Sequence, residues 1–231
     1  PKVVDASTAH RTAPGWVFGF AELAPDQTEA IRTAQRVTNP GCHATGVIAL
    51  IRPLVDAGLI PADHALTLPS VSGYSGGGRQ MMEAYEAGTA PLFEAYGLGL
   101  SHKHLPEIMA YTGLTCRPIF MPMVGNFAQG MLIQLPLHLD LLPTRPRVAD
   151  LQAALERHYA PVNGVPGAVS VCPPTENGRL DALALNGSNQ MELRVYGNEA
   201  HRHAVLVARL DNLGKGASGA AVQNLRLMLG V

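Results

Sequence analysis

Short apolar segments separated by polar turns recur along this chain. Residues 66–71, 119–124, 131–138, 169–172, 190–196 and 204–211 are rich in Val, Ile, Leu and Met. Segments of this length and composition predict strands, and the third of them alternates weakly between apolar and polar positions. Residues 3–5 and 37–38 predict two shorter strands.

Helical periodicity and helix-end signals mark the segments between these strands. Residues 148–159 are amphipathic, and residues 42–57 stop at Gly58, a residue typical of helix C-termini. We also predict helices over residues 25–35, 80–86, 91–96 and 217–229. This mixture of strands and helices indicates an α/β or α+β fold.

The composition is that of a folded chain with a substantial core. Of the 231 residues, 47% are hydrophobic and 15% are charged, which excludes a disordered chain. The formal net charge is -1 and no run of Lys and Arg stands out, so we expect no nucleic-acid partner. Arg52 and Pro53 interrupt the most apolar run, residues 46–55, so we expect no membrane-spanning segment.

Three cysteines, Cys42, Cys116 and Cys172, are scattered along the chain without a Cys-x-x-Cys pair. Their odd number favours free thiols in a reducing cytoplasm over a disulfide framework. The chain also starts inside a predicted strand, with Pro1 in place of a methionine, so we expect that an N-terminal region is missing.

Only Cys42 lies in a context that suggests chemistry. Residues 39–46 read Asn-Pro-Gly-Cys-His-Ala-Thr-Gly, which places the thiol in the first turn of a predicted helix. Unpaired N–H groups and the helix dipole favour an anion there, so we expect a lowered thiol pKa and a place for an oxyanion. The small neighbours Gly41, Ala44 and Gly46 leave room for a substrate carbonyl. The alternative is a buried structural cysteine.

Residues 101–108 bring together two histidines, a lysine and a glutamate. Imidazole suits proton transfer near neutral pH, and a reactive thiol needs such a partner. We favour His104, which the next Pro and Glu are expected to hold, over His102. A surface loop and a metal site are the alternatives, and we expect no metal because familiar ligand spacings are absent. We expect His201 and His203, another His-x-His pair, at a turn or strand start.

A glycine-rich segment, residues 72–79, joins a predicted strand to a predicted helix. Glycine lets a backbone approach a ligand closely, and its N–H groups can hold oxyanions. Ser72, Ser75 and Arg79 add groups suited to a substrate carboxylate or phosphate. The alternative is a turn without a function.

A second such segment, residues 211–221, also joins a strand to a helix. The helix start suits an anion or an amide, and its small residues allow close packing. The alternative for Lys215 is that it is only a solvated surface charge. The chain shows no Gly-x-Gly-x-x-Gly after an N-terminal strand, so the usual dinucleotide fingerprint is missing.

Four segments together resemble the shorter subtype of the N-acetyl-gamma-glutamyl-phosphate reductase family: residues 39–46, 72–79, 102–108 and 211–219. The cysteine motif and the Asp-Asn-Leu-x-Lys-Gly segment are quite specific, and the four span nearly the whole chain. The resemblance implies an α/β fold of the aspartate-semialdehyde-dehydrogenase-like type. It also implies a cytoplasmic NADPH-dependent oxidoreductase of arginine biosynthesis that acts on a small acyl phosphate and forms a homo-oligomer.

The same resemblance implies a domain division and residue roles. A partial NADP-binding domain would comprise residues 1–38 and 205–231, and the α+β catalytic and dimerisation domain residues 39–204. Cys42 matches the nucleophile that forms a thioester, and His104 the acid–base residue that protonates the thiohemiacetal oxygen. The substrate-binding candidates are Ser72, Ser75, Arg79 and His102. The NADP-binding candidates are Gly46, Asn212, Lys215, Gly216 and Gly219.

The chain departs from the family pattern in two ways. The family opens with a βαβ unit that carries a glycine-rich dinucleotide loop, whereas this sequence starts after it, so we expect an incomplete cofactor site. His43 stands where the family generally has Tyr or Phe. Three rival functions stay open: reduction of an aspartyl or carrier-linked aminoadipyl phosphate, a cysteine hydrolase or acyltransferase without NADP, and a non-catalytic assembly module.

Overall fold

Seven strands form the larger of two sheets in the computed structural model, which describes residues 1–161 and 167–231. Their order is β5 (Phe93–Ala95), β6 (Ile119–Gly125), β4 (Thr67–Gly73), β7 (Met131–His138), β10 (His203–Leu210), β9 (Met191–Asn198) and β8 (Val169–Val171). The β4–β6 and β8–β9 pairs are parallel, and the other neighbours are antiparallel. The expected α/β fold is confirmed.

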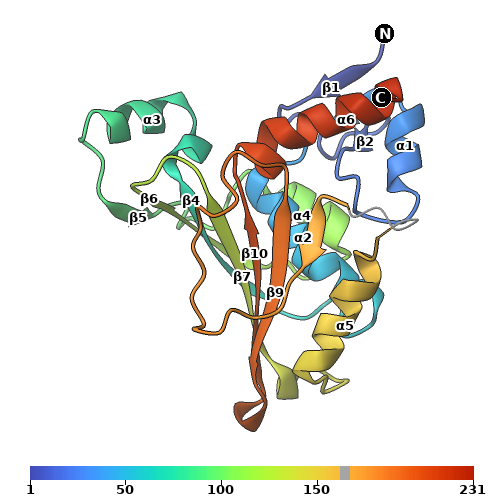
Figure 1. Ribbon diagram of the computed structural model, residues 1–231, viewed down its shortest axis with the longest axis vertical. Helices are drawn as coiled ribbons and strands as arrows, with labels where there is room; N and C mark the ends of the chain where they lie inside the picture. Colours follow the sequence, from blue (N-terminus) through green and yellow to red (C-terminus); the bar gives the residue numbers. More distant parts are fainter. Residues whose placement is uncertain (162–166) are drawn as a thin grey trace.

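The smaller sheet lies at one end of the larger and consists of three parallel strands (Figure 1). Their order is β1 (Val3–Asp5), β3 (Arg36–Thr38) and β2 (Val17–Phe18). Helices α1 (Gln27–Thr33) and α6 (Gly219–Leu229) pack beside it, around buried Ile31, Val37 and Met228. The first and last elements of the chain therefore share one small core.

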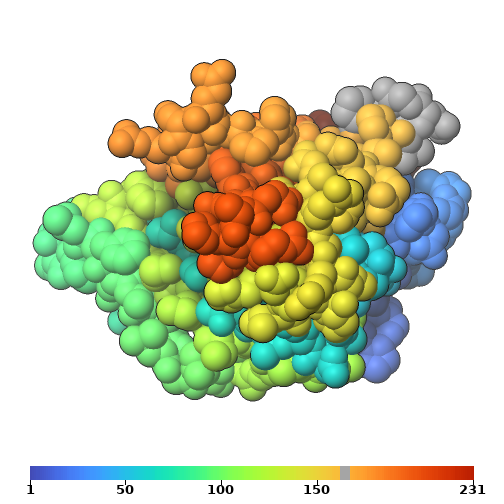
Figure 2. All heavy atoms as spheres, turned by 90° about the horizontal axis from the view of Figure 1, so that it is seen from below, coloured from blue at the N-terminus to red at the C-terminus, as the bar shows by residue number. Residues whose placement is uncertain are grey.

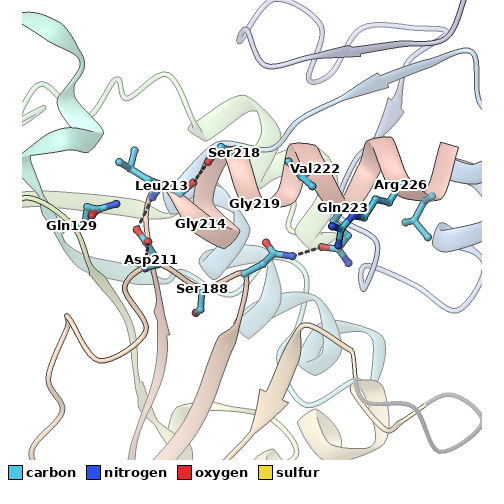
Figure 3. Close-up of a pocket in the computed structure, with 13 residues that line it drawn as sticks. Gln129, Ser188, Asp211, Leu213, Gly214, Ser218, Gly219, Val222, Gln223 and Arg226 are labelled. Atoms are coloured by element: carbon cyan, nitrogen blue, oxygen red, sulfur yellow. Dashed lines mark hydrogen bonds between the residues drawn. The ribbon is translucent and has the colours of Figure 1, made fainter. Parts of the chain in front are cut away.

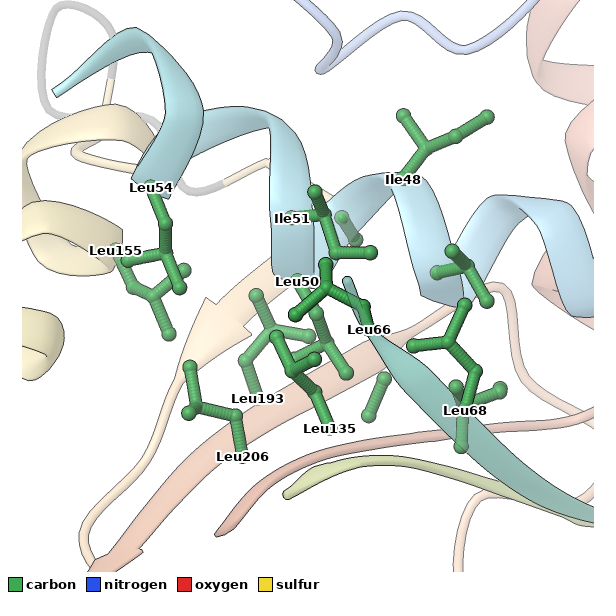
Figure 4. Close-up of a cluster of buried hydrophobic side chains, with 14 of the residues drawn as sticks. Ile48, Leu50, Ile51, Leu54, Leu66, Leu68, Leu135, Leu155, Leu193 and Leu206 are labelled. Atoms are coloured by element: carbon green, nitrogen blue, oxygen red, sulfur yellow. The ribbon is translucent and has the colours of Figure 1, made fainter. Parts of the chain in front are cut away.

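The main core lies between the large sheet and helix α2 (Cys42–Asp56). Figure 4 shows Leu50 and Leu54 of this helix facing leucines of the strands, among them Leu135, whereas Ile48 lies on the other side of the helix; Ile51 belongs to the same buried cluster. All five side chains are fully buried, and each such burial contributes about 1.5–3 kcal/mol. Helices α4 (Leu105–Thr112) and α5 (Val148–His158) flank α2. The N-terminus of α2 is thereby held rigidly.

The opposite face of the large sheet is less covered. Residues 173–190 run along part of it, and the Asp181 carbonyl there accepts a hydrogen bond from Arg209. Figure 2 shows this segment (orange) on one side of the β9–β10 turn and cyan residues near 51–60 on the other. Farther along the face, Ile119 and Met121 of β6 are 49% and 39% exposed. Apolar side chains thus meet solvent on this face.

One sequence-based prediction about local structure was wrong, and one helix was not predicted. Residues 91–96 were predicted to be helical, but Phe93–Ala95 form β5, since pairing with β6 along the sheet edge overrides the local pattern. Helix α4 was not predicted, although Pro106 occupies its first turn and Gly113 ends it in a left-handed conformation. Helix α3 (Arg79–Glu86) was predicted from residue 80.

The C-terminal part of the chain contributes to both sheets. Strand β10 pairs with β7 and β9 in the large sheet, whereas α6 packs against α1 and β1. A single π-helical turn, Gly214–Ser218, connects them. The assignment of residues 205–231 to a cofactor domain stays a prediction, and β10 itself is integral to the larger sheet.

Candidate active site

The thiol of Cys42 faces a cavity of about 500 Å³ where the two sheets meet. Gly41 is the N-cap of α2 in an extended conformation, so Cys42 is the first residue of the helix, as predicted. His104 and Lys103 line the same cavity from the start of α4. The rest of its lining comes from four further segments: Ala6 and Arg11; Asn39, Pro40 and Gly41; Ser75, Gly76 and Gly78; and Asn212, Leu213, Gly216, Ala217, Ser218 and Ala221. Segments far apart in sequence thus surround one thiol.

Gly41 has no side chain because two charged or polar groups occupy the space beside it. A Cβ built there would overlap both the His104 ring and the Arg11 guanidinium. On the other side, a Cβ at Gly216 would lie 2.7 Å from the Cβ of Cys42. Glycine at these two positions therefore lets the imidazole and the π-helical turn approach the thiol closely.

A buried ion pair borders the cavity. Nη1 of Arg11 lies 2.6 Å from Oε1 of Glu107, and the backbone N–H of Gly41 donates to Oε2 of Glu107 at 3.1 Å. Arg11 also donates to the carbonyl oxygens of Asn39 and Ala6. The pair therefore ties the loop after β1 to the start of α2 and to α4. Sequence analysis missed Arg11, whose only signal was an arginine in the polar turn after the first strand.

Burial dominates the acid–base properties of the thiol. It raises the pKa of Cys42 to about 11, although the backbone N–H of His43 opposes that rise. The expectation of a lowered thiol pKa was wrong, because desolvation at this packed helix start outweighs the favourable N–H groups. The free thiol is protonated at neutral pH and needs a base when it reacts.

Three histidine rings cluster beside the thiol: the centroid of His102 lies 4.7 Å from that of His104, and the His43 ring lies 5.6 Å from both. Burial lowers the pKa of His43 to about 3 and of His102 to about 4, and lowers that of His104 well below its usual value. All three imidazoles are therefore neutral at rest, and a protonated ring here needs a negative charge nearby to stabilise it.

Hydrogen bonds leave His104 the freest of these rings. His43 Nδ1 lies 2.8 Å from Ser70 Oγ and its Nε2 lies 3.2 Å from the Tyr96 hydroxyl. His102 accepts a hydrogen bond from the backbone N–H of His104. The buried Nδ1 of His104 has no hydrogen-bond partner in the part of the chain that the structure describes. His104 is also the one of the three that lines the cavity.

Comparison with known proteins identifies the family. The chain is 52% identical to N-acetyl-gamma-glutamyl-phosphate reductase 2 of Pseudomonas putida, and the alignment covers 99% of this chain and 74% of the relative. It is 52% identical to N-acetyl-gamma-glutamyl-phosphate reductase of Mesorhizobium japonicum over 100% of this chain and 76% of that relative. The chain belongs to the N-acetyl-gamma-glutamyl-phosphate reductase family. The family expected from the sequence is confirmed.

A domain model and solved structures agree with this family at the level of fold. Residues 42–212 match the model described as semialdehyde dehydrogenase, dimerisation domain. Aspartate semialdehyde dehydrogenase II from Vibrio cholerae superposes with a TM-score of 0.71 at 15% identity, covering 99% of this chain and 72% of that one. The enzyme from Candida albicans, solved with NADP, gives 0.64 at 14% identity, covering 99% and 70%.

For this member of the reductase family, the substrate-binding candidates divide into two groups. Ser75 lines the cavity, and its Oγ accepts a hydrogen bond from Asn212. Ser72 is buried outside the cavity lining and donates to the carbonyl of Gly73. Arg79 points into solvent and pairs with Glu83 on its own helix. The structure therefore brings Ser75, but neither Ser72 nor Arg79, to Cys42.

The NADP-binding candidates of the reductase family divide in the same way. Asn212 and Gly216 line the cavity, whereas Gly46 packs against Ile133 on the sheet side of α2. Lys215 is not a solvated charge: it is 1% exposed and donates to Glu22 and Gln223, both at 2.7 Å. Only two of these five candidates meet the thiol's cavity.

Gly219 lines a second cavity of about 580 Å³ on the far side of the π-helical turn (Figure 3). Asp211, Ser188 and Gln223 also face it, but Cys42 does not.

Residues 1–161 and 167–231 contain no group of three or more His, Cys, Asp and Glu side chains that could hold a metal ion. His201 ends a short 3-10 helix and His203 begins β10, as expected. No described helix is long and apolar enough to cross a bilayer.

Proposed function

We propose that this chain carries the site at which N-acetyl-glutamyl 5-phosphate is reduced to N-acetyl-glutamate 5-semialdehyde, with NADPH as reductant and release of phosphate. The observation that carries the proposal is the single cavity lined by both Cys42 and the neutral, unpartnered imidazole of His104. The names of relatives at about half identity support the reaction, which belongs to arginine biosynthesis in the cytoplasm.

The resting charges decide how the thiol reacts. Cys42 is protonated and His104 is neutral, so His104 takes the thiol proton as the sulfur attacks the acyl carbonyl. N–H groups at the start of α2 face the oxyanion that forms. The C–O bond to phosphate then breaks, a thioester remains on Cys42, and the proton on His104 passes to the departing phosphate. After reduction the sulfur leaves as a thiolate, and a proton from water restores the thiol through His104.

The cavity beside Cys42 fits a nicotinamide ring. Its floor is formed by Gly216, Ala217 and Ala221, and Gly216 already touches Cys42, so a flat ring meets no large side chain there. Asn212 and Ser218 offer polar groups at its edge. Bound NADPH supplies the hydride that reduces the thioester. We assign Asn212 and Gly216 to this site.

Two cations border the cavity where the substrate anions would lie. Arg11 is paired with Glu107, whereas Lys103 is exposed and has no ion-pair partner among the described residues. Lys103 and the Ser75 hydroxyl are the groups we assign to the phosphate of the substrate. His102 stands behind His104 and supports its orientation through the His104 backbone.

We further propose that two copies of the chain pair through the less covered face of the large sheet. Exposed Ile119 and Met121 on that face would become buried. The name of the matching domain family, a dimerisation domain, supports this arrangement.

The test runs the reaction backwards on the full-length protein, with N-acetyl-glutamate 5-semialdehyde, NADP and phosphate, following NADPH absorbance. We expect NADPH formation, and a loss of about 10⁴-fold for Cys42→Ser and about 10³-fold for His104→Gln. His102→Gln is the matched control and retains more activity than His104→Gln. Turnover of aspartate semialdehyde in preference to the acetylated substrate would overturn the assignment.

A further inference from the structure

Glu107 is a buried carboxylate to which the reaction described above gives no role. It lies in the first turn of α4, three residues after His104, and is 1% exposed. We propose that Glu107 is a positioning residue: it fixes the start of α2 through Gly41 and supplies the negative charge that faces His104 when the imidazole carries the thiol proton. This inference rests on the proposed function only where turnover is measured, because the reactivity of the thiol can be measured without substrate.

The hydrogen bonds around Glu107 favour its charged form. Oε1 accepts from Arg11 and Oε2 accepts from the backbone N–H of Gly41, so both oxygens act as acceptors. Burial raises the pKa of this carboxyl, and Arg11 and the Gly41 N–H oppose the rise. A carboxylate therefore stands beside the N-cap of the helix that bears the nucleophile.

The carboxylate is close to His104 without binding it at rest. Oε1 of Glu107 lies 4.0 Å from Nε2 of His104, beyond hydrogen-bond distance. Of the acidic side chains in residues 1–161 and 167–231, it is the one within 4.0 Å of a His104 nitrogen. The groups that add to burial in lowering the pKa of His104 are His43, His102, Arg11 and Lys103, and none of them is acidic. Glu107 is thus the counter-charge that stabilises an imidazolium here.

The same charge acts in the opposite direction on the thiol. Glu107 raises the pKa of Cys42, whereas Arg11 and Lys103 lower it. At rest the carboxylate adds to the burial that keeps the sulfur protonated, and after proton transfer it stabilises the protonated base. Removing the Glu107 carboxylate should therefore change two properties in opposite directions. The thiol of Cys42 should react faster with an alkylating reagent, and turnover of the substrate should become slower.

The experiment compares Glu107→Gln with the unaltered protein in two assays. Gln keeps an acceptor for Gly41 but leaves Arg11 unpaired, so the Cys42 pKa falls. We expect iodoacetamide to alkylate the Cys42 peptide at least about threefold faster at pH 8, read by mass spectrometry, because the thiolate is the nucleophile. Turnover in the NADPH assay should fall by about 100-fold. Glu83→Gln, which also removes a carboxylate paired with an arginine but on the surface, should change neither.

The outcomes separate a positioning role from a structural one. Slower alkylation together with slower turnover would mean that Glu107 only maintains the fold, and this overturns the inference. Unchanged turnover would overturn it as well. Glu107→Asp, which restores the charge, should return alkylation toward the unaltered rate. Alkylation needs neither substrate nor NADP, so a shift in alkylation without reductase activity in the unaltered protein would refute the proposed function and leave the charge effect standing.

Discussion

Two buried ion pairs in this molecule look alike and serve different ends. Arg11–Glu107 and Lys215–Glu22 have nearly equal N–O distances, 2.6 and 2.7 Å, and each joins the N-terminal segment to a later part of the chain. The first borders the cavity that contains Cys42. The second is enclosed by Gln223 and the Phe20 ring, whose centroid is 5.4 Å from the lysine nitrogen. Burial of charge is common to both, so the neighbours decide the role.

The environment of each cation explains the difference. Lys215 sits where burial lowers its pKa, but Glu22 and Gln223 hold it, and it is not among the residues lining the thiol's cavity. Arg11 instead lies against Gly41, one residue before the nucleophile. We therefore expect the Lys215 pair to determine stability and the Arg11 pair to determine reactivity.

In the comparison of the two ion pairs, the largest effect is expected from removing both charges of the pair at the cavity. The double variant Arg11→Met/Glu107→Leu leaves no unpaired buried charge, so it should fold with an unfolding free energy within about 2 kcal/mol of the original. Turnover in the NADPH assay should fall by about 1000-fold, because charge at the transition state loses its fixed partners. Turnover within tenfold of the original would show that the two pairs are equivalent.

Breaking the enclosed pair comes next. Lys215→Met strands the Glu22 carboxylate and should cost about 3–5 kcal/mol in urea unfolding. Adding Glu22→Leu should recover most of that loss, and the folded double variant should keep its turnover within about fivefold of the original, since neither residue lines the thiol's cavity. A well-folded but inactive double variant would instead support the NADP-binding role that the family resemblance implies for Lys215.

A smaller effect is expected from the cation that has no ion pair. Lys103→Gln should raise the KM for phosphate in the reverse reaction by about tenfold and leave the KM for the semialdehyde nearly unchanged. Lys103→Arg, which keeps the charge, is the matched control. A rise in the semialdehyde KM alone would mean that Lys103 pairs with the substrate carboxylate.

The smallest effect is expected at the surface. Arg79, whose side chain is 91% exposed, pairs with Glu83 within one helix and lies outside the cavity lining. Arg79→Ala should leave the melting temperature within about 1 °C and both KM values within about twofold, because exposed pairs contribute little. A tenfold rise in either KM would restore Arg79 as a substrate-binding residue.

Local signals predicted the centre of the site, and long-range contacts completed it. A Pro-Gly entry to a helix is visible in sequence, so the position of Cys42 in a helical first turn was predicted. His104, the histidine favoured over His102, lines the cavity, and its acid–base role stays a prediction. Arg11 meets Glu107 across 96 positions, and no local pattern indicates that contact. Likewise the burial that raises the Cys42 pKa comes from packing that the sequence does not display.

The fold also contains elements that local patterns predict and elements that depend on long-range pairing. Helix α2 and strands β4, β6, β7 and β10 follow from apolar periodicity and lie within a few residues of their predicted bounds. Strand β5 has three residues at the sheet edge, and only its pairing with β6 makes it a strand. The glycine-rich segment 72–79 shows that composition alone does not predict which residues reach a ligand site. Within this one segment Ser75 lines the cavity, whereas Arg79 lies in solvent.

Segments far apart in the sequence meet at the small sheet. Nζ of Lys2 donates to the carbonyl of Met228 across 226 positions, and α6 supplies part of the core beneath the small sheet. During synthesis the large sheet lacks β10, the strand between β7 and β9, until residue 210 is made, and the small sheet is not covered until α6 follows. Contacts between segments so far apart slow folding, so we expect the small core to form only after residues 219–229 are made.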